Sequence, residues 1–548
     1  MSGEADRENL FQRREVVMVQ RSTLHADVVV IGFGAAGACA ALEAASTGAR
    51  VVVLDRFAGG GATALSGGVV YAGGGTDVQR AAGVSDTPEA MFAYLRQEVG
   101  DAVSERTLRR FCEGSAEMVR WLAQHGVPFE GSLCPYKTSY PSNRHYLYYS
   151  GSEAAGGFRD AAPPAPRGHR AKGRGTSGKV LHAALAAAVR RAGVRVLTQT
   201  RARELVVDAD GRVCAVDCER LTGPAARAHR VIGEVAAKPG LYVPKLARVL
   251  HRQVERLERR AEPLRVHADR AVVIAAGGFI ANRQMLREHA PAYRGGLPLG
   301  TQGDDGSGIR LGQAVGGATA KLDRVSAWRF ITPPSALLSG LVVGPSGTRI
   351  GDESRYGAAL GQEVVEEHGR RAWLLIDQRV RRAARSQLRS QTVWFQRLQA
   401  EYLLATAATG DTLEAVAGKA GIDPRALADA VERHNRAARS GEPDPAGKPA
   451  EFVQVLDQPP YALLDLSVRP TVAYPCPMLT LGGLRVDEDT GQVLDVRGDP
   501  VPGLFAAGRS AVGICSNSYV SGLSLADCVF SGRRAGLHSV KELTDADR

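Results

Sequence analysis

Residues 26–37 read Ala-Asp-Val-Val-Val-Ile-Gly-Phe-Gly-Ala-Ala-Gly, and this stretch decides the fold. Its first half ends in a run of β-branched residues, which is typical of a parallel strand buried on both faces. Its second half is the pattern GxGxxG, and it leads into an alanine-rich segment, residues 38–46, with high helix propensity. A second apolar run, residues 50–54, ends at the acidic Asp55. Strand, glycine turn, helix and strand in this order predict a Rossmann-like unit in an α/β protein.

Each glycine of the turn has a physical role. Gly32 permits the tight turn, Gly34 lets the backbone approach a pyrophosphate, and Gly37 lets the helix pack close to the strand. Unpaired amides at the start of the helix attract the phosphates. Asp55 would accept hydrogen bonds from ribose hydroxyls, and its charge disfavours a 2′-phosphate. The residues expected here at the dinucleotide are Gly32, Gly34, Ala35, Ala36, Gly37, Asp55 and Arg56.

GxGxxG alone does not separate NAD from FAD, but a second loop does. Residues 59–68, Gly-Gly-Gly-Ala-Thr-Ala-Leu-Ser-Gly-Gly, follow the βαβ unit directly. Small residues let the backbone lie flat against a bulky planar group, as an isoalloxazine ring requires. The loop therefore favours FAD, and the residues expected beside it are Thr63, Ala64, Ser66, Gly67 and Gly68.

The rest of the chain divides around this unit. Residues 1–24 are polar and aperiodic, which predicts a flexible extension. A hairpin around Asp210-Gly211 and a buried strand at 271–276 complete a first part of the FAD domain, residues 25–288. Helical, Arg/Glu-rich sequence then predicts an inserted α+β capping domain that covers the substrate, residues 289–465. Strand patterns return in residues 466–548, so the FAD domain is expected to be discontinuous.

A basic amphipathic helix is predicted within the first part, at about 240–263. Its apolar residues recur at three- and four-residue steps between arginines. Docking on the body, pairing in an oligomer and contact with a membrane surface all remain open for it.

Composition excludes several classes of function. The net charge of +11 comes mostly from scattered arginines rather than a basic groove with aromatics, so we expect no nucleic-acid partner. The eight cysteines show no zinc spacing, so we expect no metal. A membrane-spanning apolar stretch and a secretory leader are both missing, so we expect a cytoplasmic protein, with membrane association confined to the surface.

Together these motifs resemble the fumarate reductase and succinate dehydrogenase flavoprotein superfamily over roughly residues 25–548. The similarity also rests on Ala-Ala-Gly-Gly-Phe at 275–279, a GDG-like turn at 303–308 and Gly-Leu-Phe-Ala-Ala-Gly at 503–508. Where covalent members carry a histidine in the first glycine-rich loop, this chain has Ala62-Thr63, which implies non-covalent FAD. The further residues expected at FAD are Ala202, Ala276, Gly277, Gly508, Ser524 and Leu525.

Departures from the superfamily narrow the substrate. Fumarate reductases carry His-Thr-Met-Gly-Gly and Asn-Arg-Leu-Gly-Gly segments, but residues 479–483 and 519–523 here read Leu-Thr-Leu-Gly-Gly and Tyr-Val-Ser-Gly-Leu. Without those cations the site has little to hold a dicarboxylate. The Tyr-x-Ser-Gly segment instead resembles the 3-ketosteroid dehydrogenase branch, in particular the Δ4-(5α)-dehydrogenases, which pair Tyr-x-Ser with another tyrosine.

Desaturating a ketone next to its carbonyl needs a base and a hydrogen-bond donor, and a phenol can play either role. We expect Tyr519 to be the acid/base group, with Ser521 relaying its proton. Tyr356 is the candidate second tyrosine from the capping domain, although packing at a domain interface explains it equally well. The alternatives Tyr140, Tyr148, Tyr461 and Tyr474 stay open.

The sequence thus predicts an FAD-dependent oxidoreductase that acts on a CH–CH bond next to a ketone in a small hydrophobic, steroid-like substrate. Δ1-Desaturation and reduction of another enone are alternatives within the enzyme class. A non-catalytic flavin redox sensor is the alternative from another class. The electron acceptor and the oligomeric state stay unassigned.

Overall fold

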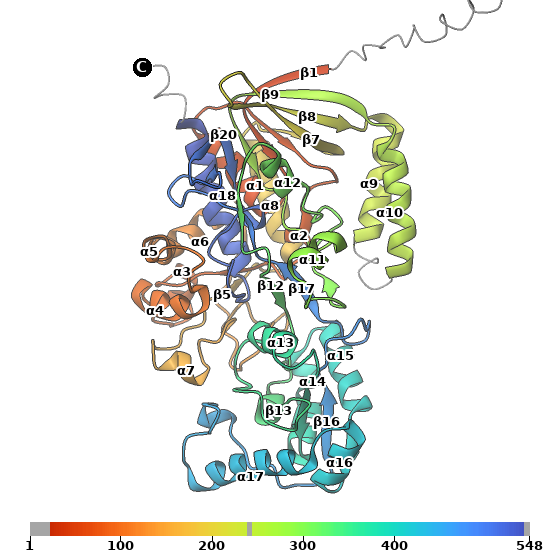
Figure 1. Ribbon diagram of the computed structural model, residues 1–548. Helices are drawn as coiled ribbons and strands as arrows, with labels where there is room; N and C mark the ends of the chain where they lie inside the picture. The colour runs from red at the N-terminus through yellow and green to blue at the C-terminus, as the bar shows by residue number, and fades with distance from the viewer. Residues whose placement is uncertain (1–21, 238–243, 542–548) are drawn as a thin grey trace, which may run out of the picture.

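Parallel strands form the centre of the nucleotide-binding body (Figure 1). In the computed structural model, which describes residues 22–237 and 244–541, β1 pairs in parallel with both β2 and β9. β6 and β20 extend the sheet in parallel, and β7, β8 and β19 are antiparallel additions that bring it to eight strands. The strands are β1 (Ser22–Ile31), β2 (Val51–Leu54), β6 (Arg195–Leu197), β7 (Thr200–Val207), β8 (Val213–Arg220), β9 (Glu262–Ile274), β19 (Gln492–Leu494) and β20 (Pro500–Ala506). The predicted Rossmann-like fold is confirmed.

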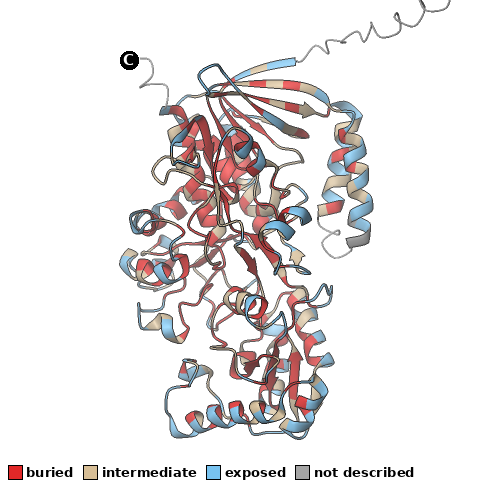
Figure 2. Ribbon diagram, in the orientation of Figure 1, coloured by how far each residue is buried: buried red, intermediate tan, exposed pale blue. Residues whose placement is uncertain are grey.

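Alternate residues of the central strands pack on opposite faces of this sheet, because successive side chains of a strand point to opposite sides. Val28 and Val30 join a core with helices α1 (Ala35–Ser46), α8 (Gly178–Arg191) and α18 (Leu523–Lys541). Val29 and Ile31 join a second core with β7, β8 and α12 (Ser307–Ala314). Figure 2 shows the sheet buried between these layers. Because both faces of β1 are buried, its residues form the unbroken apolar run from which the strand was predicted.

Smaller elements surround the body. A three-stranded sheet and a group of helices flank α18, and short strand pairs connect the body to the cap. They are α2 (Gly61–Leu65), β3 (Val69–Tyr71), α3 (Asp77–Ala81), α4 (Pro88–Val99), α5 (Glu105–Glu113), α6 (Ser115–Gln124), β4 (Leu147–Tyr148), α7 (Gly156–Arg159), β5 (Gly168–Arg170), α11 (Arg283–His289), β10 (Leu297–Pro298), β11 (Thr319–Ala320), β12 (Val325–Ala327), β17 (Pro477–Thr480), β18 (Gly483–Leu484) and η3 (Gly508–Ser510).

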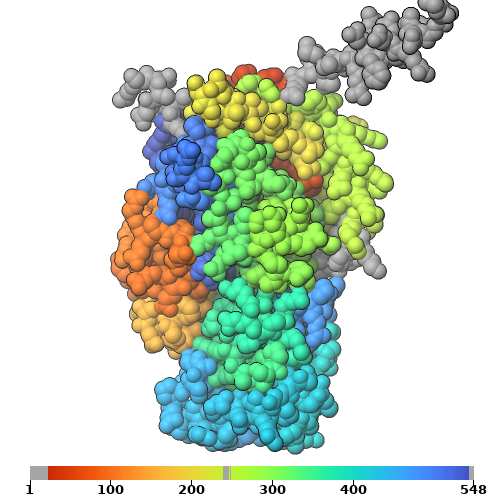
Figure 3. All heavy atoms as spheres, viewed as in Figure 1, coloured from red at the N-terminus to blue at the C-terminus, as the bar shows by residue number. Residues whose placement is uncertain are grey.

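The cap forms the lower lobe in Figures 1 and 3 and has its own core around a four-stranded antiparallel sheet. Its elements are η1 (Ser335–Ser339), β13 (Leu341–Val343), α13 (Gly357–Glu366), β14 (Trp373–Ile376), α14 (Gln378–Gln391), α15 (Trp394–Thr406), β15 (Ala408–Gly410), α16 (Leu413–Ala420), α17 (Pro424–Ser440), η2 (Ala450–Phe452) and β16 (Tyr461–Asp465). Tyr293 already packs in the cap core, whereas Ile309 and Leu311 of α12 pack in the body. The chain therefore passes between the two units more than once, which single boundaries at 288/289 and 465/466 do not describe.

Two expectations need correction. Residues 22–24 were assigned to the extension, but they belong to β1, because the long β9 offers Leu264, Arg265 and Val266 as pairing partners. The rest of that extension, residues 1–21, lies outside the described residues. The insertion predicted as one helix is a pair, α9 (Gly223–Ala237) and α10 (Pro244–Glu258), which pack against each other. The sequence did not predict α9, because this helix has fewer charged residues than α10 and opens with Gly-Pro.

Among the described residues, no helix combines the length and the apolar character needed to cross a membrane.

Candidate active site

A cavity of about 680 Å³ opens where the parallel strands of the body end. Residues that follow the carboxyl ends of four strands line it, namely Gly32, Asp55, Ala275 and Ala507. Ligands of open α/β sheets bind at this edge. The cavity also reaches Trp328 and Tyr519, so it joins the nucleotide-binding edge to the contact between body and cap.

The glycine turn adopts the geometry that its sequence predicts. Gly32 has φ +107°, and a Cβ there would lie 2.4 Å from the carbonyl oxygen of Ala275. A Cβ on Gly37 would lie 1.9 Å from the carbonyl oxygen of Gly32. Gly37 therefore sits beneath the turn, away from the cavity, and holds the helix close to the strand. The cavity-lining members of the motif are Gly32, Gly34, Ala35 and Ala36.

Asp55 organises the loop around it. Its carboxylate accepts hydrogen bonds from the amides of Phe33 at 2.9 Å, Phe57 at 2.8 Å and Gly59 at 3.2 Å. Asp55 also lines the cavity, and Oδ2 accepts only the Phe33 amide among these three bonds, so it keeps a lone pair for a ribose hydroxyl. The predicted ribose ligand thus also stabilises the turn.

The second glycine-rich loop contributes only part of its predicted set. Thr63, Ala64 and Ser66 line the cavity, and the hydroxyl of Thr63 accepts a hydrogen bond of 3.0 Å from the amide of Ala35. Gly67 and Gly68 lie behind this lining. The carbonyl of Gly67 accepts a hydrogen bond from Tyr140 Oη, and a Cβ on Gly68 would lie 2.6 Å from the backbone of Ser177. Their small size serves packing of the loop.

The remaining predicted cofactor residues come from distant parts of the chain. Ala202, Ala276, Gly277, Ser524 and Leu525 all line the cavity, as does Arg56. Gly508 does not line it, although Ala507 and Arg509 on either side do. A Cβ on Gly508 would lie 2.9 Å from the Cβ of Ala36, so this glycine lets η3, the turn after β20, pass close to α1.

Tyr519 and Tyr356 meet between the body and the cap, although 163 positions separate them in the sequence. Their ring centroids lie 6.3 Å apart. Both rings are buried in one apolar cluster, and Trp328 stacks on Tyr519 at 4.8 Å. The cluster consists of Leu299, Trp328, Phe330, Tyr356, Ala358, Leu479, Leu481 and Tyr519. This cluster offers a flat hydrophobic molecule an apolar surface, and the two phenols are its polar groups.

Ser521 serves tyrosines other than Tyr519. A hydrogen bond of 3.1 Å joins its hydroxyl to Tyr148 Oη. A hydrogen bond with Ser521 also lowers the pKa of Tyr356, against a larger upward effect of burial. Tyr519 instead has Ser524 as its hydroxyl partner. Within the described residues the Ser521 hydroxyl is thus hydrogen-bonded to Tyr148 and not to Tyr519, so a direct relay from Tyr519 to Ser521 stays a prediction.

The other candidate tyrosines separate by environment. Tyr140 Oη lies within hydrogen-bonding distance of two backbone carbonyls that share its single hydrogen. Tyr474 Oη donates to the carbonyl of Phe330, and Tyr461 lies in the sheet of the cap. Tyr148 is fully buried and reaches the site only through Ser521. Tyr356 is therefore the second tyrosine that lies beside Tyr519.

Both phenols are weaker acids than an exposed tyrosine. Burial raises the pKa of Tyr519 to about 12, while the hydrogen bond with Ser524 pulls it down. Burial also raises the pKa of Tyr356 well above its usual range, and repulsion from the neighbouring phenols adds to the effect.

Comparison with known proteins identifies the family. The protein family whose description is "FAD binding domain" matches residues 27–523 of this chain. The chain belongs to this FAD-binding family. The 3-oxo-5-alpha-steroid 4-dehydrogenase of Comamonas testosteroni is 40% identical, over 88% of this chain and 92% of that protein. A 3-oxosteroid 1-dehydrogenase of Mycobacterium tuberculosis is 29% identical, over 93% and 98%.

A solved structure agrees with these relatives. The 3-ketosteroid-delta4-(5alpha)-dehydrogenase of Rhodococcus jostii RHA1, in complex with 4-androstene-3,17-dione, matches with a TM-score of 0.79 and 32% identity. The match covers 96% of this chain and 99% of that one. The protein is accordingly an FAD-dependent oxidoreductase of the fumarate reductase and succinate dehydrogenase superfamily.

The cavity suits FAD at a residue that the sequence did not single out. Arg509 is buried and lines the cavity, and Asp304 binds its Nη2 atom. Its Nη1 atom finds no hydrogen-bond partner among the described residues. A buried unpaired donor is costly, so it indicates a site for an electron-rich group such as a phosphate or a flavin carbonyl. The start of α18 at Ser524 and Leu525 adds helix amides that favour the same charge. Arg509 directly follows the segment 503–508, and its partner Asp304 lies within the turn at 303–308, so both adjoin motifs already noted.

Within the described residues, Glu363, Glu367 and His368 bring possible metal-ligand atoms within 4.8 Å of one another on the cap. Glu363 already forms an ion pair of 3.0 Å with Arg355, and the group is not among the residues that line the cavity.

Proposed function

We propose that this protein desaturates a 3-ketosteroid-like ketone at the bond next to its carbonyl, as a Δ4-(5α)-dehydrogenase does. One observation carries the proposal: Tyr519 and Tyr356, from the body and from the cap, share an apolar cluster at the FAD cavity. When bound, FAD accepts a hydride from the carbon β to the carbonyl. The protein must therefore take up one proton from the α carbon and polarise the carbonyl.

The two phenols divide this work by position. Tyr519 lines the cavity that holds FAD, so it acts as the base. Burial holds the pKa of Tyr356 well above its usual range, so Tyr356 keeps its proton and donates a hydrogen bond to the carbonyl oxygen. Ser521, whose hydroxyl is hydrogen-bonded to Tyr148, supports Tyr356 as the hydrogen-bond donor. The surrounding apolar side chains exclude water, which strengthens both interactions.

Two relatives support the substrate class. The Comamonas relative is named as a 4-dehydrogenase of 3-oxo-5-alpha steroids, and the Rhodococcus structure holds 4-androstene-3,17-dione. The corresponding 1-dehydrogenase is less similar at 29% identity, so Δ1-desaturation is the second candidate.

Anaerobic titration of the yellow protein tests the proposal. We expect 5α-androstane-3,17-dione to bleach the flavin absorbance, because the saturated ketone is the hydride donor for Δ4-desaturation. We expect 4-androstene-3,17-dione to bind without bleaching. Bleaching by the enone alone would assign Δ1-desaturation instead, and silence with both steroids would leave the redox-sensor alternative.

We propose further that the outer face of the α9–α10 pair contacts an anionic membrane surface, from which a steroid-like substrate can partition. The two helices carry both exposed apolar residues and exposed arginines, a combination typical of interfacial helices. They are Val231, Val235, Leu246, Val249, Arg248, Arg252 and Arg256. In Figure 1 the pair stands at the side of the body, with one face free.

Sedimentation with phospholipid vesicles tests this contact. The protein should sediment with vesicles that contain phosphatidylserine and stay in the supernatant with phosphatidylcholine alone. Val249→Glu should weaken the binding about tenfold, because it places a negative charge at the lipid. Val496→Glu, at an exposed valine outside the pair, should bind like the wild type. Equal sedimentation of both variants would contradict the contact.

A further inference from the structure

The α9–α10 pair is an excursion from an otherwise continuous antiparallel ladder. β8 and β9 pair up to Arg220 opposite Glu262, where a short turn would suffice to connect them. Instead the chain leaves the sheet at Leu221 and returns at Ala261, and the two helices run alongside the body (Figures 1 and 3). A long excursion from paired strands, unlike a tight turn, brings its own side chains to another part of the molecule.

The side chains of this pair reach the cavity of the FAD site. Five residues of the two helices line it: Arg230, Gly233, Glu234, Ala237 and His251. Opposite them lies the loop after β2, where Asp55, Arg56 and Phe57 line the same cavity. His229 of α9 stacks on Phe57 with ring centroids 5.6 Å apart and planes at 22°. Since the acidic residue at the end of the second strand marks the ribose of a Rossmann dinucleotide, the pair covers the adenosine end.

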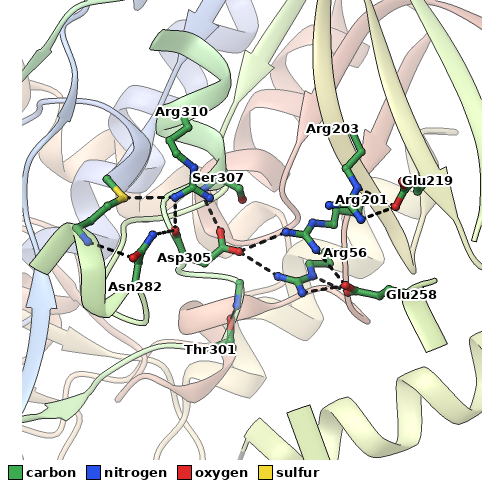
Figure 4. Close-up of polar contacts among 12 residues, drawn as sticks. Arg56, Arg201, Arg203, Glu219, Glu258, Asn282, Thr301, Asp305, Ser307 and Arg310 are labelled. Carbon is green, nitrogen blue, oxygen red and sulfur yellow. Dashed lines mark hydrogen bonds and ion pairs between the residues drawn. The ribbon is translucent and has the colours of Figure 1, made fainter. Parts of the chain in front are cut away.

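A buried carboxylate ties this pair to the body. Glu258, at the end of α10, accepts two hydrogen bonds from Arg56, with Nε–Oε1 at 2.6 Å and Nη2–Oε2 at 3.0 Å. Arg201 of β7 adds a third at 3.1 Å (Figure 4), and His229 Nε2 lies 3.4 Å from Oε1. The side chain of Glu258 is only 9% exposed. Charged groups are buried in this way only when they are paired, so the contact is specific.

The network continues into the turn that bounds the cavity. Asp305 accepts a hydrogen bond of 3.0 Å from Arg56 Nη1 and lies 3.9 Å from Arg201 Nη2 (Figure 4). Asn282 donates to the carbonyl of Asp305 at 2.9 Å, which fixes the turn. Two arginines thus bridge two carboxylates, one on the helical pair and one on the body.

Glu258 stays charged over the physiological range. Burial raises its pKa, but hydrogen bonds from His229 and Arg56 and the charges of Arg56 and Arg201 outweigh this and lower the pKa to about 2. Acidification within the range that enzymes experience therefore leaves the contact closed.

We propose that the α9–α10 pair is a lid over the adenosine end of FAD, and that Glu258 is the latch that holds it closed on Arg56 and Arg201. The lid opens about its two connections to β8 and β9 and controls how fast FAD enters and leaves. This proposal depends only on membership of the FAD-binding family and not on the steroid activity. A steroid titration without bleaching would therefore not contradict it. The lining residues on the lid add adenosine contacts that the GxGxxG motif does not provide.

Release of FAD from Glu258→Gln protein tests the latch. The amide keeps the shape of the side chain but loses its charge and half of its acceptors. After dilution into a large volume of flavin-free buffer, the rise of free-FAD fluorescence with time gives the release rate. We expect release to be at least about tenfold faster than in the wild type. Glu219→Gln is the matched control, because it breaks the exposed Arg203–Glu219 pair of the neighbouring strands β7 and β8 (Figure 4), which neither lines the cavity nor binds Glu258, and it should leave the rate within about twofold.

Hydrogen exchange provides the second measurement. Backbone amides of α9 and α10 should exchange more slowly in the FAD-loaded wild type than in the apoprotein, and Glu258→Gln should abolish this difference. A variant in which a short turn replaces residues 222–260 should also release FAD faster, and it decides the matter if Glu258→Gln fails to fold. The lid proposal would be overturned if both variants released FAD at the wild-type rate. It would also be overturned if hydrogen exchange in the two helices were the same with and without FAD.

Discussion

Tyr519→Phe should slow flavin reduction by 5α-androstane-3,17-dione by about 100-fold or more, the scale of a lost general base. The ring stays in place between Trp328 and Tyr356, so FAD and steroid should still bind. Rapid mixing of oxidised protein with substrate, without oxygen, measures the bleaching rate directly. Tyr293→Phe is the matched control, because its hydroxyl donates to Glu366 inside the cap at 2.6 Å and lies outside the cavity.

The pH dependence of the same reaction assigns the role of Tyr519. Its phenol acts as a base only when deprotonated, and with a pKa of about 12 the deprotonated fraction rises about tenfold per pH unit below that value. The wild-type rate should therefore rise with pH through the range in which the protein is stable, Tyr356→Phe should keep the slope, and Tyr519→Phe should lose it. A flat wild-type profile would show instead that Tyr519 is the donor and works with its proton in place.

Gly37→Ala should abolish FAD binding. A methyl group at this position would lie 1.9 Å from the carbonyl oxygen of Gly32, a backbone atom of the turn that the dinucleotide contacts. Helix α1 must then move away from β1, which opens the turn and shifts the amides at Ala35 and Ala36 that line the cavity. The purified protein should be colourless, as absorbance and flavin fluorescence after denaturation will report.

Gly418→Ala controls for the general effect of replacing a glycine in a helix. Gly418 lies in α16 of the cap, where an added Cβ meets nothing within 4 Å. This variant should bind FAD normally and gain about 0.5–1 kcal/mol of stability, because alanine has less conformational entropy to lose in a helix. If the Gly37→Ala protein were yellow and released FAD at the wild-type rate, the turn would have adjusted to the added methyl group. That result would contradict the prediction for Gly37.

Local features were predictable because their physics is local. A buried parallel strand, a turn that requires positive φ at Gly32, and a helix with a tight packing glycine each leave a short pattern in the chain. Tyr519 and Ser521 were singled out differently, by the resemblance of their Tyr-x-Ser-Gly segment to that of the 3-ketosteroid dehydrogenases. The hydrogen-bond partner of Ser521 was not predictable locally, because Tyr148 lies 373 positions away in the chain.

The amino-acid sequence by itself determined the Rossmann-like unit and the choice of FAD, since both depend on motifs within one stretch of the chain, residues 26–68. The resemblance of the segment 519–522 to that of the 3-ketosteroid dehydrogenases pointed to Tyr519. Only the tertiary structure decided that Tyr356 faces Tyr519, that Arg509 offers an unpaired donor to the cavity, and that Glu258 binds Arg56 across 202 positions. These contacts join segments that come together only after the sheet, the cap and the helical pair have packed. Their pairing energy depends on distance and burial in space, which periodicity along a chain does not encode.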